Sequence, residues 1–241
     1  MKLKNKTIIV TGSSKGVGRE ICALLTNEGN NVVAVSRSRA EVVDEINEKG
    51  WEAIWVKADV SNEKDMENVF KRAIKKFRKV DGIINNAGIL LSKPIDKTNY
   101  EEFDAILKVN VRGVFIGCKL AKKYIKEGVI VNAASDVGLP HHGKKNLSAY
   151  TASKFAIIGL TEALAKEFYP KIRVYAIAPH NIATGMSGFR GNSPVLVAKA
   201  YVRALKEKLG IKSGGHVVVG TIKDANKKWK KVPTVRIKSK K

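Results

Sequence analysis

A tyrosine and a lysine in the stretch YTASK are the side chains of this sequence best suited to acid–base chemistry. Tyr150 and Lys154 lie four residues apart in an amphipathic segment, which places them on one face of a helix. At about 6 Å and an effective dielectric constant near 20, a lysine cation stabilises a phenolate by roughly 3 kcal/mol, or about two pKa units. The pair therefore predicts a tyrosine that exchanges a proton near neutral pH, although a surface pair on a helix has the same pattern.

A glycine-rich stretch, TGSSKGVG, lies between an apolar run and an amphipathic one near the start of the chain. Gly12, Gly16 and Gly18 let the backbone turn tightly and approach a pyrophosphate, and a helix beginning near Gly16 offers unpaired N–H groups. The spacing, GxxxGxG, is one residue wider than the usual dinucleotide fingerprint. In this strand–turn–helix context it predicts a dinucleotide-binding loop, the alternative being a turn that only connects the two elements.

The end of the second apolar run indicates which dinucleotide is bound. A carboxylate at this place would bind a ribose 2′-hydroxyl, but the sequence VAVSRSRA supplies Arg37 instead. Arg37 can hold a 2′-phosphate through two hydrogen bonds, and Lys15 in the glycine loop can reach the same phosphate. We therefore predict NADP(H) rather than NAD(H). The alternative is that both cations are only solvated surface residues.

Three further stretches complete an ordered set of five motifs. They are NNAG at residues 85–88, VNVRGVF around Asn110, and NAASDVG, in which Ser135 closes the fifth apolar run. In type, order and spacing the set resembles the short-chain dehydrogenase/reductase family, over residues 5 to about 186. The compact length and general pattern look like the 3-oxoacyl-[acyl-carrier-protein] reductase branch.

The resemblance implies a catalytic role for four residues. Tyr150 would be the acid/base, Lys154 would lower its pKa and bind the nicotinamide ribose, and Ser135 would hydrogen-bond the substrate oxygen. Asn110 would hold a water molecule in a proton relay. We expect Ser135 rather than the adjacent Asp136 to act, because an acidic side chain near the hydride path would repel a phenolate, whereas a hydroxyl stabilises an oxyanion.

The resemblance also implies a set of cofactor contacts. Asp59 would contact the adenine, Asn86 to Gly88 would line the adenosine ribose, and Ile182 and Thr184 match the stretch that contacts the carboxamide. The full predicted cofactor-binding set is Gly12, Ser14, Lys15, Gly16, Val17, Gly18, Arg37, Asp59, Val60, Asn86, Ala87, Gly88, Tyr150, Lys154, Pro179, Ile182 and Thr184.

Two segments depart from the family pattern. His180 follows Pro179 where the family usually has glycine; it would be strained if the backbone there requires a positive φ, and it could instead face the substrate pocket as a donor. The segment between Ser135 and Tyr150 carries two adjacent histidines, without a third ligand at metal-binding spacing, so we expect loop surface or pocket wall and no metal site. Two lysines beside them would suit an anionic substrate or are simply solvated. These four residues are His141, His142, Lys144 and Lys145.

The elements that must position these residues alternate regularly along the chain. Apolar, β-branched runs predict seven strands, and amphipathic segments between them predict helices. The strands are expected at residues 7–11, 31–36, 51–58, 81–86, 128–134, 172–178 and 215–220, and the helices at 20–29, 63–77, 100–125 and 149–168. Residues 180–194 are predicted to form a long irregular loop. The pattern is typical of an α/β doubly wound Rossmann fold with a seven-stranded parallel sheet covered by helices on both faces.

Length and composition predict one domain, at residues 1–226, and a basic C-terminal tail, at residues 227–241. The tail contributes to a formal net charge of +23, which favours anionic partners. The N-terminal stretch has no secretory-signal pattern, so we expect a cytoplasmic protein. Cys22 and Cys118 are far apart, beside apolar residues, and are expected to be buried reduced thiols.

Two functions of different classes are compatible with the sequence. The first is an NADP(H)-dependent carbonyl reductase, with 3-oxoacyl thioesters as the first substrate, since acyl carrier protein and coenzyme A are both acidic. The resemblance implies a homotetramer or homodimer and no membrane contact. The second is a nucleic-acid-binding or NADP-sensing protein on the same fold, because KKWKKVPTVRIKSKK interleaves Trp229 with lysines that permit stacking and phosphate contacts.

Overall fold

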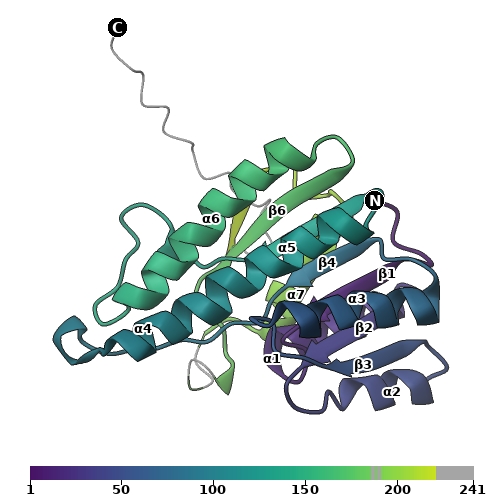
Figure 1. Ribbon diagram of the computed structural model, residues 1–241, viewed down its shortest axis with the longest axis horizontal. Helices are drawn as coiled ribbons and strands as arrows, with labels where there is room; N and C mark the ends of the chain where they lie inside the picture. Colours follow the sequence, from purple (N-terminus) through teal and green to yellow (C-terminus); the bar gives the residue numbers. More distant parts are fainter. Residues whose placement is uncertain (186–187, 189–190, 221–241) are drawn as a thin grey trace, which may run out of the picture.

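The computed structural model of the protein describes residues 1–185, 188 and 191–220, so the basic tail lies outside the described residues. Seven parallel strands form one sheet in the order β3-β2-β1-β4-β5-β6-β7 (Figure 1). This confirms the predicted fold class. The strands are β1 (Thr7–Thr11), β2 (Asn31–Ser36), β3 (Ala53–Lys57), β4 (Gly82–Asn85), β5 (Gly128–Ala133), β6 (Ile172–Pro179) and β7 (His216–Val219).

Helices cover both faces of the sheet, as Figure 1 shows. They are α1 (Gly16–Asn27), α2 (Val42–Glu48), α3 (Glu63–Phe77), α4 (Tyr100–Leu107), α5 (Gly113–Tyr124), α6 (Ser148–Phe168) and α7 (Pro194–Leu205). Apolar side chains of α1, α2 and α7 form one core with the sheet, and those of α3, α5 and α6 form the other. Among the described helices, none has the length and apolar character needed to cross a bilayer.

Two helices were absent from the sequence prediction. Helix α2 is only seven residues long, which is too short for a clear helical period. Helix α7 starts at Pro194, and the Ser193 side chain accepts a hydrogen bond from Val195 N at its N-terminus. Its mostly apolar sequence, PVLVAKAYVRAL, has little polar face because it is buried between α1 and the sheet.

The single helix predicted at residues 100–125 is interrupted. A π-helical turn at Lys108–Arg112 separates α4 from α5, and Asn110, which is 1% exposed, lies within it. Such a turn inserts an extra residue into the helical repeat and is common at functional sites. It places Asn110 toward the interior, where its side chain meets the segment that follows β4.

The order of strands reverses between β1 and β4. In the register of the sheet, Val10 of β1 pairs with Ala34 of β2 on one side and with Ile84 of β4 on the other. The loops that follow β1 and β4 therefore leave the same edge in opposite directions and border a crevice, which is where doubly wound sheets bind ligands.

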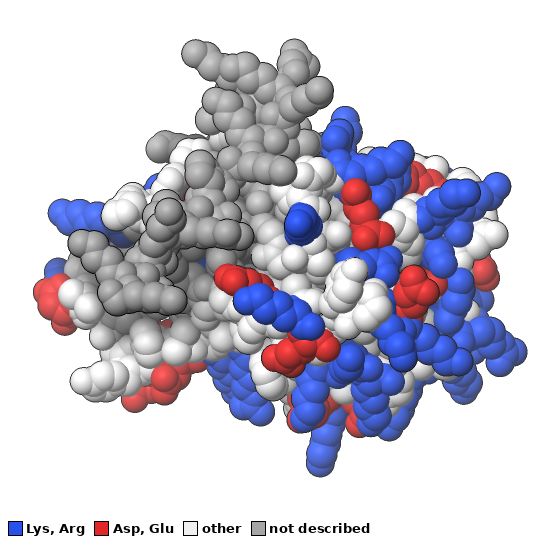
Figure 2. Space-filling view, turned by 90° about the horizontal axis from the view of Figure 1, so that it is seen from above, with Lys and Arg blue, Asp and Glu red and all other residues white. Residues whose placement is uncertain are grey.

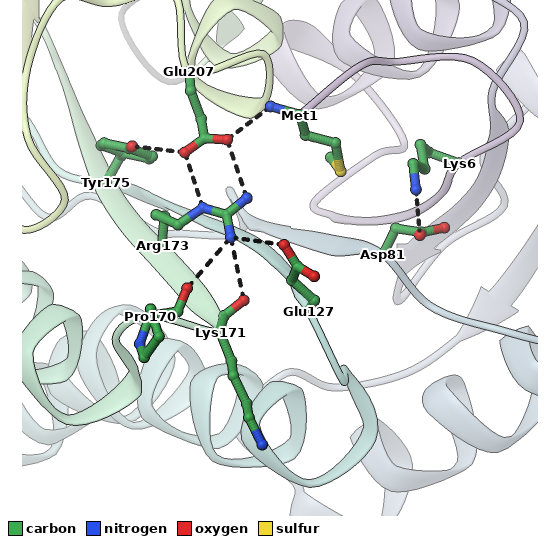
Figure 3. Close-up of polar contacts among 9 residues, drawn as sticks. All are labelled: Met1, Lys6, Asp81, Glu127, Pro170, Lys171, Arg173, Tyr175 and Glu207. Atoms are coloured by element: carbon green, nitrogen blue, oxygen red, sulfur yellow. Dashed lines mark hydrogen bonds and ion pairs between the residues drawn. The ribbon is translucent and has the colours of Figure 1, made fainter.

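The opposite edge of the sheet is held by a polar cluster (Figure 3). Arg173 of β6 donates from Nε and Nη2 to the two carboxylate oxygens of Glu207, at 2.9 and 3.1 Å. Glu207 also accepts from the N-terminal amine of Met1 at 2.7 Å and from the Tyr175 hydroxyl at 3.3 Å. Although burial opposes ionisation, the hydrogen bonds from Arg173 and the terminal amine lower the pKa of Glu207 to about 2. The cluster joins β6 to the residues after α7, far from the crevice.

Both cysteines are free and buried, as predicted. Burial raises the pKa of the Cys22 and Cys118 thiols to about 12. The thiolate is the reactive form of cysteine, so neither side chain is activated for nucleophilic chemistry.

Candidate active site

The loop between β1 and α1 has backbone positions that only glycine fits. Gly12 and Gly16 have φ values of +70° and +59°, in the left-handed region. A Cβ at Gly12 would lie 2.8 Å from the Ala87 Cα, and one at Gly18 would lie 2.1 Å from the Gly12 carbonyl oxygen. The first N–H groups of α1 have no side-chain cap from Lys15. The loop thus presents bare backbone and a helix N-terminus, which fits the pyrophosphate of a dinucleotide.

The loop after β4 is tied to this glycine loop. The Thr11 hydroxyl oxygen accepts from Asn86 N at 2.9 Å and from Ala87 N at 3.0 Å. In return the Asn86 side-chain amide donates to the carbonyl oxygens of Thr11 and Gly12, at 3.0 and 3.3 Å. Asn86 therefore braces the loop through its side chain, and its contact with a cofactor ribose stays a prediction.

Two arginines follow β2, and they differ in their contacts with the described residues. Arg37 is exposed, and its guanidinium makes no hydrogen bond or ion pair with any described residue. Arg39 pairs with Asp44 at 2.5 Å and lies 5.2 Å above the Trp55 ring. Hydrogen bonds from Ser61 are the largest cause that lowers the pKa of Asp59, and the positive charge of Arg37 acts in the same direction. Arg37 is therefore near the predicted adenosine end of the crevice and is free to bind an anion.

Tyr150 and Lys154 lie one turn apart on α6, as predicted, with the Lys154 Nζ 5.4 Å from the centre of the tyrosine ring. The predicted lowering of the tyrosine pKa is wrong for this structure. Burial raises the pKa of Tyr150 to about 12, only partly offset by a hydrogen bond with Ser135, and the charge of Asp136 raises it further. Burial also lowers the pKa of Lys154 to about 8, and its ammonium donates to the Ala133 carbonyl at 2.7 Å. Tyr150 is accordingly a protonated phenol at neutral pH.

The Asn110 side chain joins the segment after β4 to α6. Its Oδ1 accepts from Ile89 N at 2.8 Å, and its Nδ2 donates to Ile89 O at 2.9 Å and to Ser153 Oγ at 3.1 Å. A Cβ at Gly88 would lie 3.2 Å from the Asn110 Oδ1 and 3.8 Å from the Lys154 Nζ, so the NNAG loop reaches the catalytic pair. Both amide hydrogens of Asn110 are used in this bracing, and its role in a proton relay stays a prediction.

Ser135 at the end of β5 donates from Oγ to Asp136 Oδ1 at 3.0 Å. The other carboxylate oxygen, Oδ2, lies 2.5 Å from His180 Nδ1 and 3.4 Å from Lys144 Nζ. The Asp136 side chain is only 4% exposed. Burial opposes its ionisation, but the hydrogen bonds from His180 and Ser135 and the charge of Lys144 prevail and lower the pKa of Asp136. This cluster was not predicted, although the acid after Ser135 and the base in place of glycine were both visible in the sequence.

The strain considered for His180 does not occur. Its φ is not positive; the left-handed positions nearby are Asn181 at +27° and Gly220 at +135°. The backbone N–H of His180 donates to Val219 O at 2.7 Å, and its carbonyl accepts from the Asn192 side chain at 2.8 Å. The residue thus continues the pairing of β6 with β7, and its side chain is free to face Asp136.

The loop after β6 approaches the glycine loop. Pro179 ends β6, and Ile182 forms an isolated bridge with Asn192. A Cβ at Gly16 would lie 3.2 Å from the methyl group of Thr184, which places this predicted carboxamide-contacting residue against the start of α1. The segment therefore closes one end of the crevice.

The other predicted positions separate into core and surface. Val17 and Val60 are buried, Ser14 is half-buried, and Lys15 is exposed. The adjacent His141 and His142 are also exposed. Among residues 1–185, 188 and 191–220, no three His, Cys, Asp or Glu side chains converge as a metal site would require.

Comparisons with known proteins agree with this geometry. The profile of the family described as short chain dehydrogenase matches residues 6–194. The chain is 38% identical to 3beta-hydroxysteroid dehydrogenase 1 of Eggerthella lenta over 204 residues, which cover 80% of this chain and 76% of that protein. It is 35% identical to the 3-oxoacyl-[acyl-carrier-protein] reductase FabG of Staphylococcus epidermidis over 192 residues, 76% of this chain and 78% of that one. A short chain dehydrogenase of Burkholderia cenocepacia J2315, solved in complex with NADP, superposes with a TM-score of 0.84 at 28% identity, covering 91% of this chain and 98% of that one.

Proposed function

The chain belongs to the short chain dehydrogenase family, and on this premise we propose that it is an NADP(H)-dependent oxidoreductase that interconverts a carbonyl compound and a secondary alcohol. The observation that carries the proposal is the meeting of Tyr150, Lys154 and Ser135 beside the glycine loop. Three elements distant in sequence, β5, α6 and the segment after β4, contribute to this meeting.

The cofactor proposal rests on the crevice and on Arg37. The glycine loop and the N-terminus of α1 would hold the pyrophosphate, and Arg37 with Lys15 would hold a 2′-phosphate. The Burkholderia cenocepacia relative is solved with NADP, in line with this assignment. When bound, NADP(H) supplies or accepts the hydride.

The chain's own residues would manage the proton. With a pKa of about 12, Tyr150 holds its proton at neutral pH and is a hydrogen-bond donor to a carbonyl oxygen. After transfer, the Lys154 ammonium beside the ring would stabilise the phenolate left behind. Ser135 lies next to Tyr150 and would contact the same substrate oxygen.

We infer 3-oxoacyl thioesters as the first substrates to test. The similarity to the FabG of Staphylococcus epidermidis supports this class, and the similarity to a steroid dehydrogenase supports a second one. The positive surface charge of the protein also favours substrates on acidic thioester carriers. Figure 2 shows Lys and Arg side chains gathered over the half of the molecule that holds the N-terminus and α3 in Figure 1. Exposed cations of α3, α5 and the residues after them are Lys64, Lys71, Arg72, Lys75, Lys76, Arg78, Lys79, Lys119, Lys122, Lys123 and Lys126.

We infer assembly into a homodimer or homotetramer from exposed aromatic side chains on α5 and α6. Phe115 and Phe155 are 48% and 41% exposed, on two helices that contact each other. Large apolar side chains at the surface of adjacent helices are typical of subunit interfaces. Sedimentation-equilibrium centrifugation of the wild type and of Phe115→Glu tests this, since a wild-type monomer would refute it.

The proposed function is tested by following NADPH and NADH oxidation with a panel of carbonyl compounds, each paired with its alcohol. The pairs are acetoacetyl-coenzyme A with 3-hydroxybutyryl-coenzyme A, a 3-oxo steroid with its 3-hydroxy form, and cyclohexanone with cyclohexanol. Tyr150→Phe should lose turnover while keeping NADPH binding. The control Tyr100→Phe changes a tyrosine that is 86% exposed and should keep wild-type rates. A wild type that binds NADPH but turns over no pair would refute the proposal.

A further inference from the structure

The hydroxyl hydrogen of Ser135 has two acceptors within reach, Asp136 Oδ1 at 3.0 Å and the Pro179 carbonyl oxygen at 3.4 Å, and the shorter contact, to the charged group, is the stronger. A carboxylate can only accept hydrogen bonds, so the 3.0 Å contact between Ser135 Oγ and Asp136 Oδ1 is donated by the serine. This holds as long as Asp136 is ionised, and its lowered pKa keeps it so at neutral pH. The lone pairs of Ser135 Oγ are what remains for a ligand.

His180 and Lys144 hold the carboxylate in this position. Both contact Oδ2, at 2.5 and 3.4 Å, and leave Oδ1 to the serine. Their side chains are 41% and 40% exposed, whereas that of Asp136 is 4% exposed. Lys144 is further fixed by Asn181 Oδ1 at 3.3 Å. In the described residues the side chains of His180 and Lys144 make polar contacts with Asp136 and not with Ser135, so they are positioning residues that act through Asp136.

The alcohol and the carbonyl compound of the proposed reaction differ in whether they can donate a hydrogen bond to Ser135. A secondary alcohol has an oxygen to accept from the Tyr150 hydroxyl and a hydrogen to donate to Ser135, so every donor meets an acceptor. A carbonyl oxygen only accepts. To donate to it, Ser135 must release Asp136, and a charge-assisted hydrogen bond is about twice as strong as the neutral one that would replace it.

We propose that Asp136, held by His180 and Lys144, keeps Ser135 as a hydrogen-bond acceptor, so that the site binds a secondary alcohol more tightly than the matching carbonyl compound. The inference rests on the proposed function and names the member of the redox pair that the site favours. It also gives a role to the departure at His180, since the buried carboxylate of Asp136 needs a donor on its second oxygen.

The test uses the alcohol and carbonyl pair of the panel that the wild type interconverts fastest. Calorimetry gives the dissociation constant of the alcohol with the NADPH-loaded protein and that of the carbonyl compound with the NADP⁺-loaded protein, two complexes that cannot react. Asp136→Asn removes the charge at constant shape and should tighten carbonyl binding roughly three- to tenfold, with alcohol binding little changed. The control Asp104→Asn, at an exposed carboxylate of α4, should leave both constants unchanged.

Ser135→Ala provides an independent measurement should Asp136→Asn fail to fold. If Ser135 is an acceptor, its loss weakens alcohol binding and leaves carbonyl binding nearly unchanged; the reverse result overturns the inference. In the Ser135→Ala background, Asp136→Asn should no longer shift the ratio of the two constants, a result that a merely structural role of Asp136 does not predict. Turnover by the wild type with unshifted ratios in both variants refutes this inference alone. Absence of any turnover refutes the proposed function and this inference with it.

Discussion

Replacing Gly12 by alanine tests whether the glycine loop is needed for close approach or only for its turn. The residue has φ +70°, which costs a side-chain-bearing residue roughly 1–2 kcal/mol. The new Cβ would also lie 2.8 Å from the Ala87 Cα and 3.0 Å from the Asn86 side-chain nitrogen, so the loop after β4 must move. Moving it strains the two hydrogen bonds that Thr11 accepts, worth about 1 kcal/mol each. We expect a total loss of roughly 3–4 kcal/mol.

Gly50→Ala is the matched control, because Gly50 has φ +77° but nothing within 4 Å of its Cβ position. Urea unfolding should show a loss of only about 1–2 kcal/mol for Gly50→Ala, the backbone term alone. A fluorescence titration should show NADPH affinity unchanged in Gly50→Ala and lowered at least tenfold in Gly12→Ala. Equal stability losses in the two variants, or unchanged NADPH affinity in Gly12→Ala, would refute the reasoning.

Three further predictions concern single contacts. Arg37→Ala should weaken NADPH binding about tenfold and leave NADH binding unchanged, while Arg39→Ala should affect neither; titrations with both cofactors check this. Glu207→Gln should cost roughly 1–2 kcal/mol at pH 7, the share that a partly exposed pair keeps after solvent screening. The folded protein depresses the pKa of Glu207 to about 2, so the stability that its carboxylate contributes is fully present above the unfolded pKa near 4.5 and is lost as the pH falls toward 2. The unfolding free energies of the wild type and the variant should therefore converge near pH 2. A difference in unfolding free energy that stays constant with pH would contradict the assignment to the ion pair with Arg173. Asn110→Ala removes three hydrogen bonds of a buried side chain and should lower the unfolding free energy by roughly 2–4 kcal/mol. A loss below about 1 kcal/mol would show that these bonds are not formed.

Local patterns predicted the parts of the fold and site that depend on neighbours in sequence. The strand–glycine–helix stretch predicted a helix beginning near Gly16, where α1 starts, and the four-residue spacing predicted that Tyr150 and Lys154 share one face of α6. The π-turn at Asn110 was not predictable in this way, because it depends on hydrogen bonds to Ile89 and Ser153, which lie 21 and 43 residues away.

The pairing of Asp136 with His180 was also not predictable from local sequence patterns. The two residues lie 44 positions apart and meet because β5 and β6 are adjacent, with Ala133 in register with Ile177. The sequence identified His180 as a departure from the family pattern, but its contact with Asp136 depends on the strand register, which the sequence alone does not give. The prediction of a lowered tyrosine pKa was wrong for a related reason. It included the charge of Lys154 but not the burial of Tyr150 and Lys154, which depends on the whole fold.

The hydrogen bonds of Thr11 have a consequence for how a cofactor binds. This one hydroxyl, at the end of β1, accepts two hydrogen bonds from the loop after β4 and so holds the two walls of the crevice together. The conformational entropy cost of ordering both walls is therefore incurred when the protein folds and not when a ligand binds, so the site is preorganised. The same wall reaches the catalytic pair, since a Cβ at Gly88 would lie 3.2 Å from the Asn110 Oδ1 and 3.8 Å from the Lys154 Nζ, so the preorganised surface extends from the glycine loop to Lys154.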